Sequence, residues 1–370
     1  MTQQQVLDNL LFIMLFGGMA MASLIACVYL LLRKGNAFAA DITPPVRLRR
    51  WAAAFFAVAF LGHVWWYLFY IYSCDIHSVS YVVLCGLDCV MLLPTIAGTL
   101  LAMLQDRKRT VWPVIIATIP YMALLGLSIV YPDSHFLNIS VAYILLLYVL
   151  FTVYMVFAVR QYRRWLRDNY ADLEHKEVWL SYLIIIAFSL FIIIYGFDDG
   201  NIIINYLVQF IGLALIGLLL WRVETLQQMD VATVEDTAET PAEPEEVAPS
   251  TIPSDIGPLL ERHCKDEQLY LQHDLSLSQL AQAIGTNHFY LSQYFTQQGQ
   301  TYNAYINGLR IRHFINLYHE AVASQCSITA QQLAHESGFR SYSTFSAAFK
   351  QRMGQTVTAW MRDTAEASAG

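Results

Sequence analysis

Seven long runs of apolar residues fill the first 222 positions of the chain. Each run is close to the ~20 residues that an α-helix needs to cross the hydrocarbon core of a bilayer. The runs cover residues 8–32, 52–72, 79–104, 111–130, 137–159, 178–196 and 202–221. The pattern predicts an all-α protein whose N-terminal domain, residues 1–222, is a bundle of seven transmembrane helices.

Basic residues occur in alternate connections between these runs. The connections after runs one, three and five carry clusters of Arg and Lys, and Arg222 follows run seven. The other connections contain Asp75, Asp133, Asp198 and Asp199 but no Lys or Arg. Because cytoplasmic loops carry the positive charge, this bias predicts an N-terminus outside the membrane and a cytoplasmic C-terminal part. The basic residues follow the first run and none precedes it, so we expect a signal anchor and not a cleaved signal peptide.

Two ionisable residues, His63 and Asp88, lie inside the apolar runs. Each is nine residues from the outer end of its run, which places both about 14 Å below the outer surface at ~1.5 Å per residue. A charge at this depth is costly unless it is paired or hydrated. The pair is therefore a candidate sensor for a ligand or a proton, lined by Trp65, Trp66 and nearby tyrosines. The alternative is a structural His–Asp hydrogen bond that joins two helices.

The connection from Arg160 to Glu177 mixes basic, acidic and aromatic residues. It predicts an extension of the fifth helix or an interfacial helix at anionic lipid headgroups. Docking of the cytosolic domain onto this connection is a less favoured alternative.

Residues 223–254 are rich in Glu, Ala, Thr and Pro and contain no Lys or Arg. A segment of this composition cannot bury a core, so a disordered acidic linker is predicted. Its first part, residues 223–229, is expected to continue the seventh helix into the cytoplasm, where it could pair with a second copy.

Composition supports a membrane protein and gives no sign of catalysis. Apolar residues make up 56% of the chain and charged residues 14%, unlike an ordinary soluble protein. The net charge of −7 comes mostly from the acidic linker. The six cysteines have no metal-binding spacing and are expected to be free thiols. We find no catalytic constellation, metal site or cofactor motif, so an enzyme is not expected.

Residues 277–360 contain two similar pieces. The shared positions are Leu280-Ala281, Gly285, Tyr290-Leu291-Ser292, Phe295 and Gly299 in the first piece, and Leu333-Ala334, Gly338-Phe339, Ser343-Thr344-Phe345, Phe349 and Gly354 in the second. Each piece predicts a helix, a tight turn that begins at a glycine, and a second helix. This is a helix-turn-helix pattern, in which the second helix enters a DNA major groove. The expected helices are Leu277–Ile284 capped by Asp274 and Ser276, His288–Gln297 capped by Asn287, Thr301–Glu320, Thr329–Glu336 capped by Ser327, and Tyr342–Arg352 capped by Ser341.

Over residues 256–362 these motifs resemble the AraC family of bacterial transcription regulators. Both units occur in the family's order, and Leu309-Arg310-Ile311 resembles its linking helix. The apolar N-terminal part resembles that of the membrane-anchored members. The resemblance implies a double helix-turn-helix domain over residues 255–364, with double-stranded DNA as its partner. Residues 365–370 are expected to be a disordered tail. The lipid bilayer is the expected partner of the apolar runs, and a homodimer is expected.

Exposed positions on the predicted recognition helices are the candidates for contacts with bases. These are His288, Phe289, Ser292 and Gln293 in the first unit, and Arg340, Tyr342, Thr344 and Ser346 in the second. Lys350 and Arg352 are candidates for phosphate contacts. For Arg310 the resemblance favours a structural role that braces the two units.

The domain departs from the family pattern at Gln293 and Ala347, where a basic residue is usual, and at Val357, which replaces a usual proline. Residues 256–370 contain eight Lys and Arg against eight Asp and Glu. A neutral domain makes few phosphate contacts, so nonspecific DNA binding is expected to be weak.

The favoured function is a one-component transcription regulator in the bacterial inner membrane. It would couple a membrane or envelope signal to sequence-specific DNA binding in the cytoplasm. One alternative is a membrane scaffold whose helix-turn-helix units bind protein, which the missing basic residues would suit. A membrane enzyme or transporter that uses His63 and Asp88 is a third, for which no further constellation exists.

Overall fold

The computed structural model describes residues 3–33, 43–72, 79–131, 135–173, 179–196, 202–229, 256–324 and 329–369, without the side chains of residues 3–9, 196 and 365–369. The chain forms two compact units. The first consists of Met1–Tyr162 and Glu177–Val231, and the second of Arg163–Lys176 and Ala232–Gly370. The acidic residues of the predicted outer connections, the linker residues 230–254 and Ser327 lie outside the described residues.

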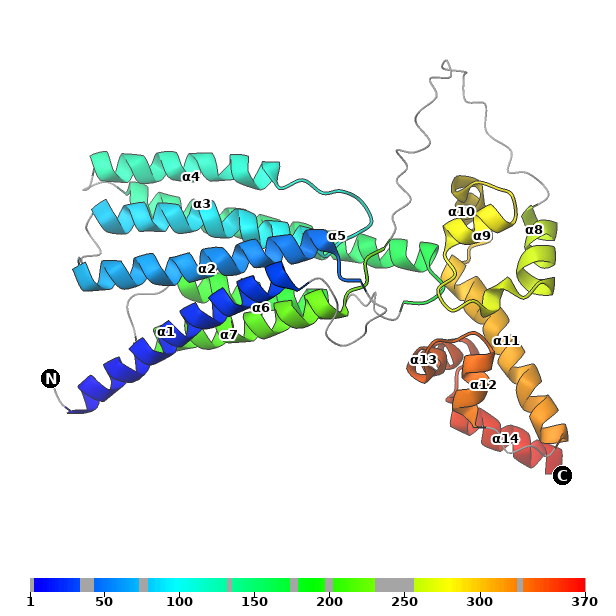
Figure 1. Cartoon of the computed structure of the whole chain (residues 1–370). Helices are drawn as coiled ribbons and strands as arrows, with labels where there is room; N and C mark the ends of the chain where they lie inside the picture. Colours follow the sequence, from blue (N-terminus) through cyan, green and yellow to red (C-terminus); the bar gives the residue numbers. More distant parts are fainter. Residues whose placement is uncertain are drawn as a thin grey trace, which may run out of the picture. The chain divides into compact units, whose positions relative to one another are not determined.

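Seven apolar helices account for the predicted runs. They are α1 (Gln3–Leu32), α2 (Val46–Tyr72), α3 (Val79–Ala102), α4 (Trp112–Val130), α5 (Phe136–Asn169), α6 (Trp179–Gly196) and α7 (Ile202–Thr225). In the part of the chain that is described, six of them are long and apolar enough to cross a membrane, and α6 is a shorter apolar helix. Except for the last turns of α5, they belong to the first unit and lie alongside one another (Figure 1).

Several helices that follow one another in sequence pack together in this bundle, and the first also packs on the last. Helix α1 packs on α2 and α7, α2 on α3, α3 on α4, and α6 on α7. Large apolar side chains such as Met14, Ile25 and Phe157 remain exposed on the outside of the bundle. Because a soluble protein rarely exposes a continuous apolar surface, the exterior of the first unit has the character of a surface that faces lipid.

Helices α2 and α3 approach each other closely at Gly98. The indole ring of Trp51 lies where a side chain on Gly98 would begin, since a Cβ built there would be 2.2 Å from the Trp51 Cε3 atom. Glycine at this position therefore lets the two helices pack.

Helix α7 ends at Thr225, and residues 226–229 are not helical, contrary to the predicted extension. The side chain of Gln105 donates to the carbonyl oxygen of Gln227 (2.9 Å) and accepts from the amide of Met229 (2.9 Å). Leu226 is fully buried. The chain therefore leaves α7 as a non-helical segment that is held by the α3–α4 connection.

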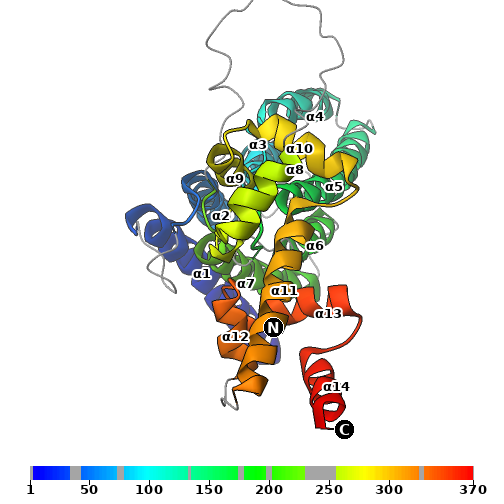
Figure 2. The same cartoon turned by 90° about the vertical axis from the view of Figure 1, so that its right-hand side faces the viewer.

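The second compact unit of the chain contains two helix-turn-helix motifs, which we call the first and second helix-turn-helix units. One long helix joins them. The elements are α8 (Ile256–Leu259), a π-helical turn (Leu260–Asp266), a 3-10 turn (Leu269–Leu271), α9 (Leu277–Ala283), α10 (His288–Gln297), α11 (Tyr302–Ala323), α12 (Ala330–Glu336), α13 (Tyr342–Met353) and α14 (Val357–Ala369). Helices α9 and α10 lie near the start of α11, and α12 and α13 near its end (Figures 1 and 2). The all-α prediction is confirmed, and α14 continues as a helix beyond residue 364, where a disordered tail was expected.

Each helix-turn-helix unit has its own apolar core. Leu280, Leu291 and Phe295 are among the buried residues of the first core. Phe314, Phe345 and Phe349 are among those of the second. Because α11 contributes Ile306 to the first core and Phe314 to the second, this single helix sets the two units relative to each other.

Candidate nucleic-acid interface

The first helix-turn-helix unit is built by local capping. Ser276 and Gln279 form a reciprocal capping box at the start of α9, which satisfies backbone amides that the helix leaves free. Gly285 adopts a left-handed conformation (φ +71°) in the turn, and Asn287 then caps α10 by accepting from the amide of Phe289. Leu291 and Phe295 are buried, so α10 turns its other side outward. Asp274, one of the two expected caps, instead forms an ion pair with Arg340 (3.1 Å).

The second unit repeats this design. Thr329 and Gln332 form the capping box of α12, so the helix begins at Ala330 and its cap is Thr329, one residue before the helix. Gly338 takes the left-handed conformation (φ +92°), and Ser341 caps α13 as predicted. Asn287 and Ser341 therefore hold the same position in the two units.

The predicted base-reading residues differ in their access to the surface. His288 and Phe289 at the start of α10 are exposed, as is Tyr342 at the start of α13. The others are half-buried and do not stand free on the surface as expected; they are Ser292, Gln293, Arg340, Thr344 and Ser346. Thr344 also belongs to the cap of α13, because its amide donates to the Ser341 hydroxyl and its own hydroxyl lies 3.1 Å from that oxygen.

The structure shows exposed positions on the second recognition helix that were not among the predicted base-reading residues. Because Asn287 and Ser341 are equivalent caps, Ser343 in α13 corresponds to Phe289 in α10, and Ala347 corresponds to Gln293. Ser343 and Ala347 are exposed, whereas Thr344 corresponds to the half-buried Tyr290. The signal was present in the sequence, since aligning the two caps gives this register directly.

The basic residues of α11 and α13 differ in exposure. Lys350 and Arg352 on α13 are exposed, in keeping with phosphate contacts. Arg310 is 1% exposed. Its Nε donates to the carbonyl oxygen of Tyr270 (2.7 Å) and its Nη2 to that of Gln272 (2.6 Å). Burial and these hydrogen bonds fit the structural role predicted for Arg310.

The turn of the second helix-turn-helix unit contacts residues 270–273, the segment that also binds Arg310. The Nδ1 atom of His273 lies 3.0 Å from the carbonyl oxygen of Gly338. The His273 ring stacks on that of His335, with 4.9 Å between the ring centroids. Residues 270–273 therefore contact the Arg310 side chain and the second turn at once, which joins the two helix-turn-helix units.

The end of α5 contacts the first helix-turn-helix unit. Residues 169–172, which we call the α5 tip, belong to the same compact unit as α9–α11. The carbonyl oxygen of Ala171 accepts from Asn303 of α11 (2.6 Å), and the Oδ1 atom of Asn169 lies 2.6 Å from Nε2 of His288. His288 keeps an exposed edge, and partial burial lowers the pKa of its imidazole. Docking on this connection was the less favoured prediction, and it is present.

Within the bundle, His63 and Asp88 do not form the expected hydrogen bond. The Asp88 carboxylate accepts from the indole nitrogens of Trp65 (3.0 Å) and Trp66 (2.6 Å) and from the hydroxyl of Tyr195. The nitrogens of His63 lie 2.7 Å from the carbonyl oxygen of Ala59 and 3.1 Å from Oε1 of Gln209. The hydrogen-bond partners on α6 and α7 could not be foreseen from the α2–α3 hairpin alone.

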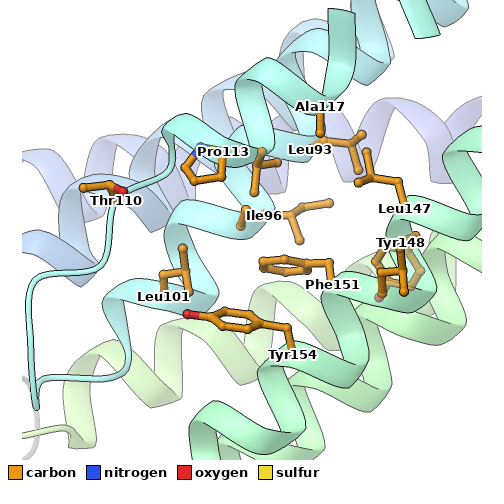
Figure 3. A pocket seen from close by; sticks show the side chains of 13 residues that line it. Leu93, Ile96, Leu101, Thr110, Pro113, Ala117, Leu147, Tyr148, Phe151 and Tyr154 are labelled. Carbon is orange, nitrogen blue, oxygen red and sulfur yellow. The ribbon is translucent and has the colours of Figure 1, made fainter. Parts of the chain in front are cut away.

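An apolar cavity of about 340 Å³ lies between α3, α4 and α5 (Figure 3). Its wall is formed mainly by aliphatic and aromatic side chains, including Ile96, Leu101 and Phe151, with the hydroxyl groups of Thr110 and Tyr154 among the few polar atoms. The volume falls within the range of small-molecule sites. Over the described residues, no group of three or more His, Cys, Asp or Glu side chains is arranged to hold a metal ion.

Comparison with known families supports the C-terminal assignment. Residues 280–363 match a family model described as a helix-turn-helix domain. Neither curated proteins nor solved structures yielded a match to the chain. The matched segment runs from α9 through both turns to α14 and includes both recognition helices. The chain therefore carries an AraC-type helix-turn-helix domain at its C-terminal end, preceded, within the residues that the structure describes, by six helices that are long and apolar enough to span a membrane.

Proposed function

We propose that this protein is a membrane-bound, one-component transcription regulator. The AraC-type domain binds double-stranded DNA at specific sequences, and the apolar bundle receives the signal that controls this binding. In this proposal all seven apolar helices cross the bacterial inner membrane, the N-terminus lies outside, and the DNA-binding domain lies in the cytoplasm. Alternation of basic and acidic connections supports this orientation.

The observation that carries the proposal is the repetition of one recognition geometry at the two ends of α11. Both α10 and α13 begin at a side-chain cap, bury an apolar stripe and expose their first residues. N-terminal residues of a recognition helix contact base edges in the major groove. His288 and Phe289 would do so in the first unit, and Tyr342 and Ser343 in the second.

Charge argues for weak binding by a single domain. Arg310 is buried and Arg340 is paired with Asp274, so the exposed basic residues of α11 and α13 are Arg312, Lys350 and Arg352. Each phosphate contact contributes about one unit to the dependence of log K on log salt concentration, so we expect a shallow salt dependence. A homodimer would double the contacts and raise the effective concentration of the second domain.

The full chain in lipid nanodiscs, mixed with a random duplex library at low salt, tests the proposal. We expect enrichment of a defined sequence. Ser343→Ala should change the preferred bases, whereas Lys350→Ala should weaken binding to every sequence about equally. If no sequence is enriched even at low salt, the domain is not a specific DNA reader and the scaffold function is favoured.

The bundle offers two places for a stimulus to act. One is the Asp88 carboxylate, which accepts from Trp65, Trp66 and Tyr195 and interacts electrostatically with His63. The other is the apolar cavity between α3, α4 and α5. A transcription reporter in cells distinguishes them. Loss of the response in both Asp88→Asn and His63→Ala at normal protein levels favours the first. Loss in Ala97→Phe, which fills the cavity, with a normal response in Asp88→Asn, favours the second.

Protease treatment of oriented membrane vesicles tests the topology. The C-terminal unit should be cleaved in inside-out vesicles and protected in right-side-out vesicles. The opposite pattern would place the domain outside the cytoplasm and overturn the function.

A further inference from the structure

The α5 tip packs into the apolar core of the first helix-turn-helix unit. Ala171 is fully buried and belongs to the same core as Leu280 and Phe295. Its amide donates to the carbonyl oxygen of Leu275 (3.2 Å). Asn303 of α11 donates to the carbonyl oxygens of Tyr170 (3.2 Å) and Ala171 (2.6 Å). Buried backbone groups are thus satisfied by the partner surface, as within a single domain.

Tyr170 extends this contact to the start of α9. It forms an isolated antiparallel bridge with Ser276, the residue that caps α9. The α5 tip therefore adds one short strand-like segment along the residues that precede the first helix-turn-helix unit.

Asp172 links the tip to the Arg310 brace. The Asp172 side chain is 2% exposed. Burial lowers the pKa of the Arg310 guanidinium, and the negative charge of Asp172 is foremost among the groups that oppose this shift. The negative charge of Asp172, in the connection between α5 and α6, therefore favours the charged form of Arg310, which joins the two helix-turn-helix units.

Asn169 engages the recognition helix itself. Its Oδ1 atom lies 2.6 Å from Nε2 of His288, the first residue of α10. Its Nδ2 group donates to the carbonyl oxygen of Trp165 (2.7 Å), which fixes the orientation of the amide at the end of α5. A helix with its side chains is about 10 Å across, and the major groove is about 12 Å wide, so α10 cannot enter a groove while α5 ends at its first residue.

We propose that the α5 tip is an intramolecular latch by which the membrane bundle controls the DNA-binding domain. With the latch closed, the end of α5 lies against the first residue of α10 and obstructs its entry into a groove, so that only the second helix-turn-helix unit is free to bind. A stimulus opens the latch by moving α5, with which the tip is continuous. This inference rests on the proposed function, because it names the regulation of the same DNA-binding surface.

Two substitutions weaken the latch from opposite sides. Asn169→Ala removes the contact with His288, and Asn303→Ala removes the two hydrogen bonds to the tip without touching a recognition helix. Each lost hydrogen bond is expected to raise affinity for an enriched duplex roughly fivefold in the unstimulated protein. Asn169→Asp, which keeps the acceptor for His288, is the matched control and should bind no more tightly than the wild type.

A reversible lock tests the same idea without altering a base-reading residue. Partners in an antiparallel bridge have Cα atoms about 4.5–5.5 Å apart, within the range of a disulfide. Tyr170→Cys with Ser276→Cys in the full chain should therefore form a cross-link on oxidation. We expect oxidation to remove footprint protection from one of two half-sites about 34 Å apart, and reduction to restore it. The two single-cysteine variants control for the native thiols.

The outcomes separate the latch from the function on which it rests. An enriched duplex that binds equally to oxidised and reduced double-cysteine protein overturns the latch and leaves the regulator intact. Weaker binding by Asn169→Ala or Asn303→Ala, in protein of normal helical content, also overturns it, because docking would then assist binding. If neither the wild type nor any variant enriches a sequence, the DNA-binding function itself fails.

Discussion

The guanidinium of Arg310 lies over the ring of Phe339, with 5.6 Å between Cζ and the ring centroid. Phe339 follows the turn glycine of the second helix-turn-helix unit, whereas the carbonyl acceptors of Arg310 precede the first unit. One buried side chain thus contacts both units. Because two recognition helices must meet the same DNA together, this contact determines whether they can act as a pair.

Arg310→Ala should destabilise the C-terminal unit strongly. The substitution removes charged donors to three carbonyl groups. Hydrogen bonds to charged groups contribute about 1.5–3 kcal/mol each, and unsatisfied buried acceptors are costly, so the loss of unfolding free energy should be about 3 kcal/mol or more. Arg312→Ala, an exposed position on the same helix, should cost about 0.5 kcal/mol or less. Pulse proteolysis of the full-length protein in urea measures both, and equal losses would contradict the bracing role.

The two turn glycines should respond differently to alanine. Both have positive φ, but a Cβ on Gly338 would lie 2.8 Å from the Cα atom of Leu271, whereas one on Gly285 would meet nothing within 4 Å. Gly285→Ala should therefore cost only the left-handed strain of about 1–2 kcal/mol. Gly338→Ala should cost about 1–3 kcal/mol more, because backbone atoms must shift. The same proteolysis assay ranks them, and the reverse order would disprove the close approach.

Gly98→Ala should weaken the packing of α2 on α3. The new Cβ would overlap the indole ring of Trp51, and overpacking of this kind costs about 1–3 kcal/mol. Gly126→Ala in α4, where a Cβ has open space, is the control. Size-exclusion profiles of heated detergent-solubilised protein should show a lower melting temperature for Gly98→Ala only. In a Trp51→Leu background the effect of Gly98→Ala should shrink, since the clashing ring is gone.

Cys264 should act as a reporter of unfolding in the C-terminal unit. The thiol is fully buried, and burial raises its pKa to about 12, compared with about 8.5 for an exposed thiol. It is therefore neutral and unreactive in the native protein at pH 8, and alkylation should occur only when the unit opens. Mass mapping of alkylated peptides at increasing urea concentrations checks this. Rapid modification in native buffer would show that the thiol is accessible.

The raised pKa of Cys264 also makes the unfolding free energy depend on pH. Because the folded pKa is raised above the unfolded value, ionisation of Cys264 favours the unfolded state. Its contribution is fully present below about pH 8.5 and is lost as pH rises toward the folded pKa of about 12. Cys264→Ala should remove this part of the alkaline decline. An unchanged pH profile in Cys264→Ala would assign the decline to other groups.

Most of the helix-turn-helix elements could be predicted because their signals are local. A cap reaches only two or three residues along the chain, as at Asn287 and Ser341, and an apolar stripe such as Leu291 and Phe295 repeats at a spacing of about one helical turn. Thr329 was overlooked as a cap because a serine two positions earlier offered the same chemistry. The register of the two recognition helices was also available, since aligning their caps assigns Ser343 and not Thr344 to the outer face.

The sequence by itself determined the apolar helices, the paired helix-turn-helix units and the acidic segment between them, because periodicity, capping and composition are properties of neighbouring residues. Only the tertiary structure decided that Asn169 reaches His288, that Asn303 binds the carbonyl oxygen of Ala171, and that Gln105 holds the exit of α7. These contacts join positions more than 100 residues apart, and each partner alone is an ordinary polar group. Their pairing depends on the path of the folded chain, which brings together donors and acceptors that no local pattern marks.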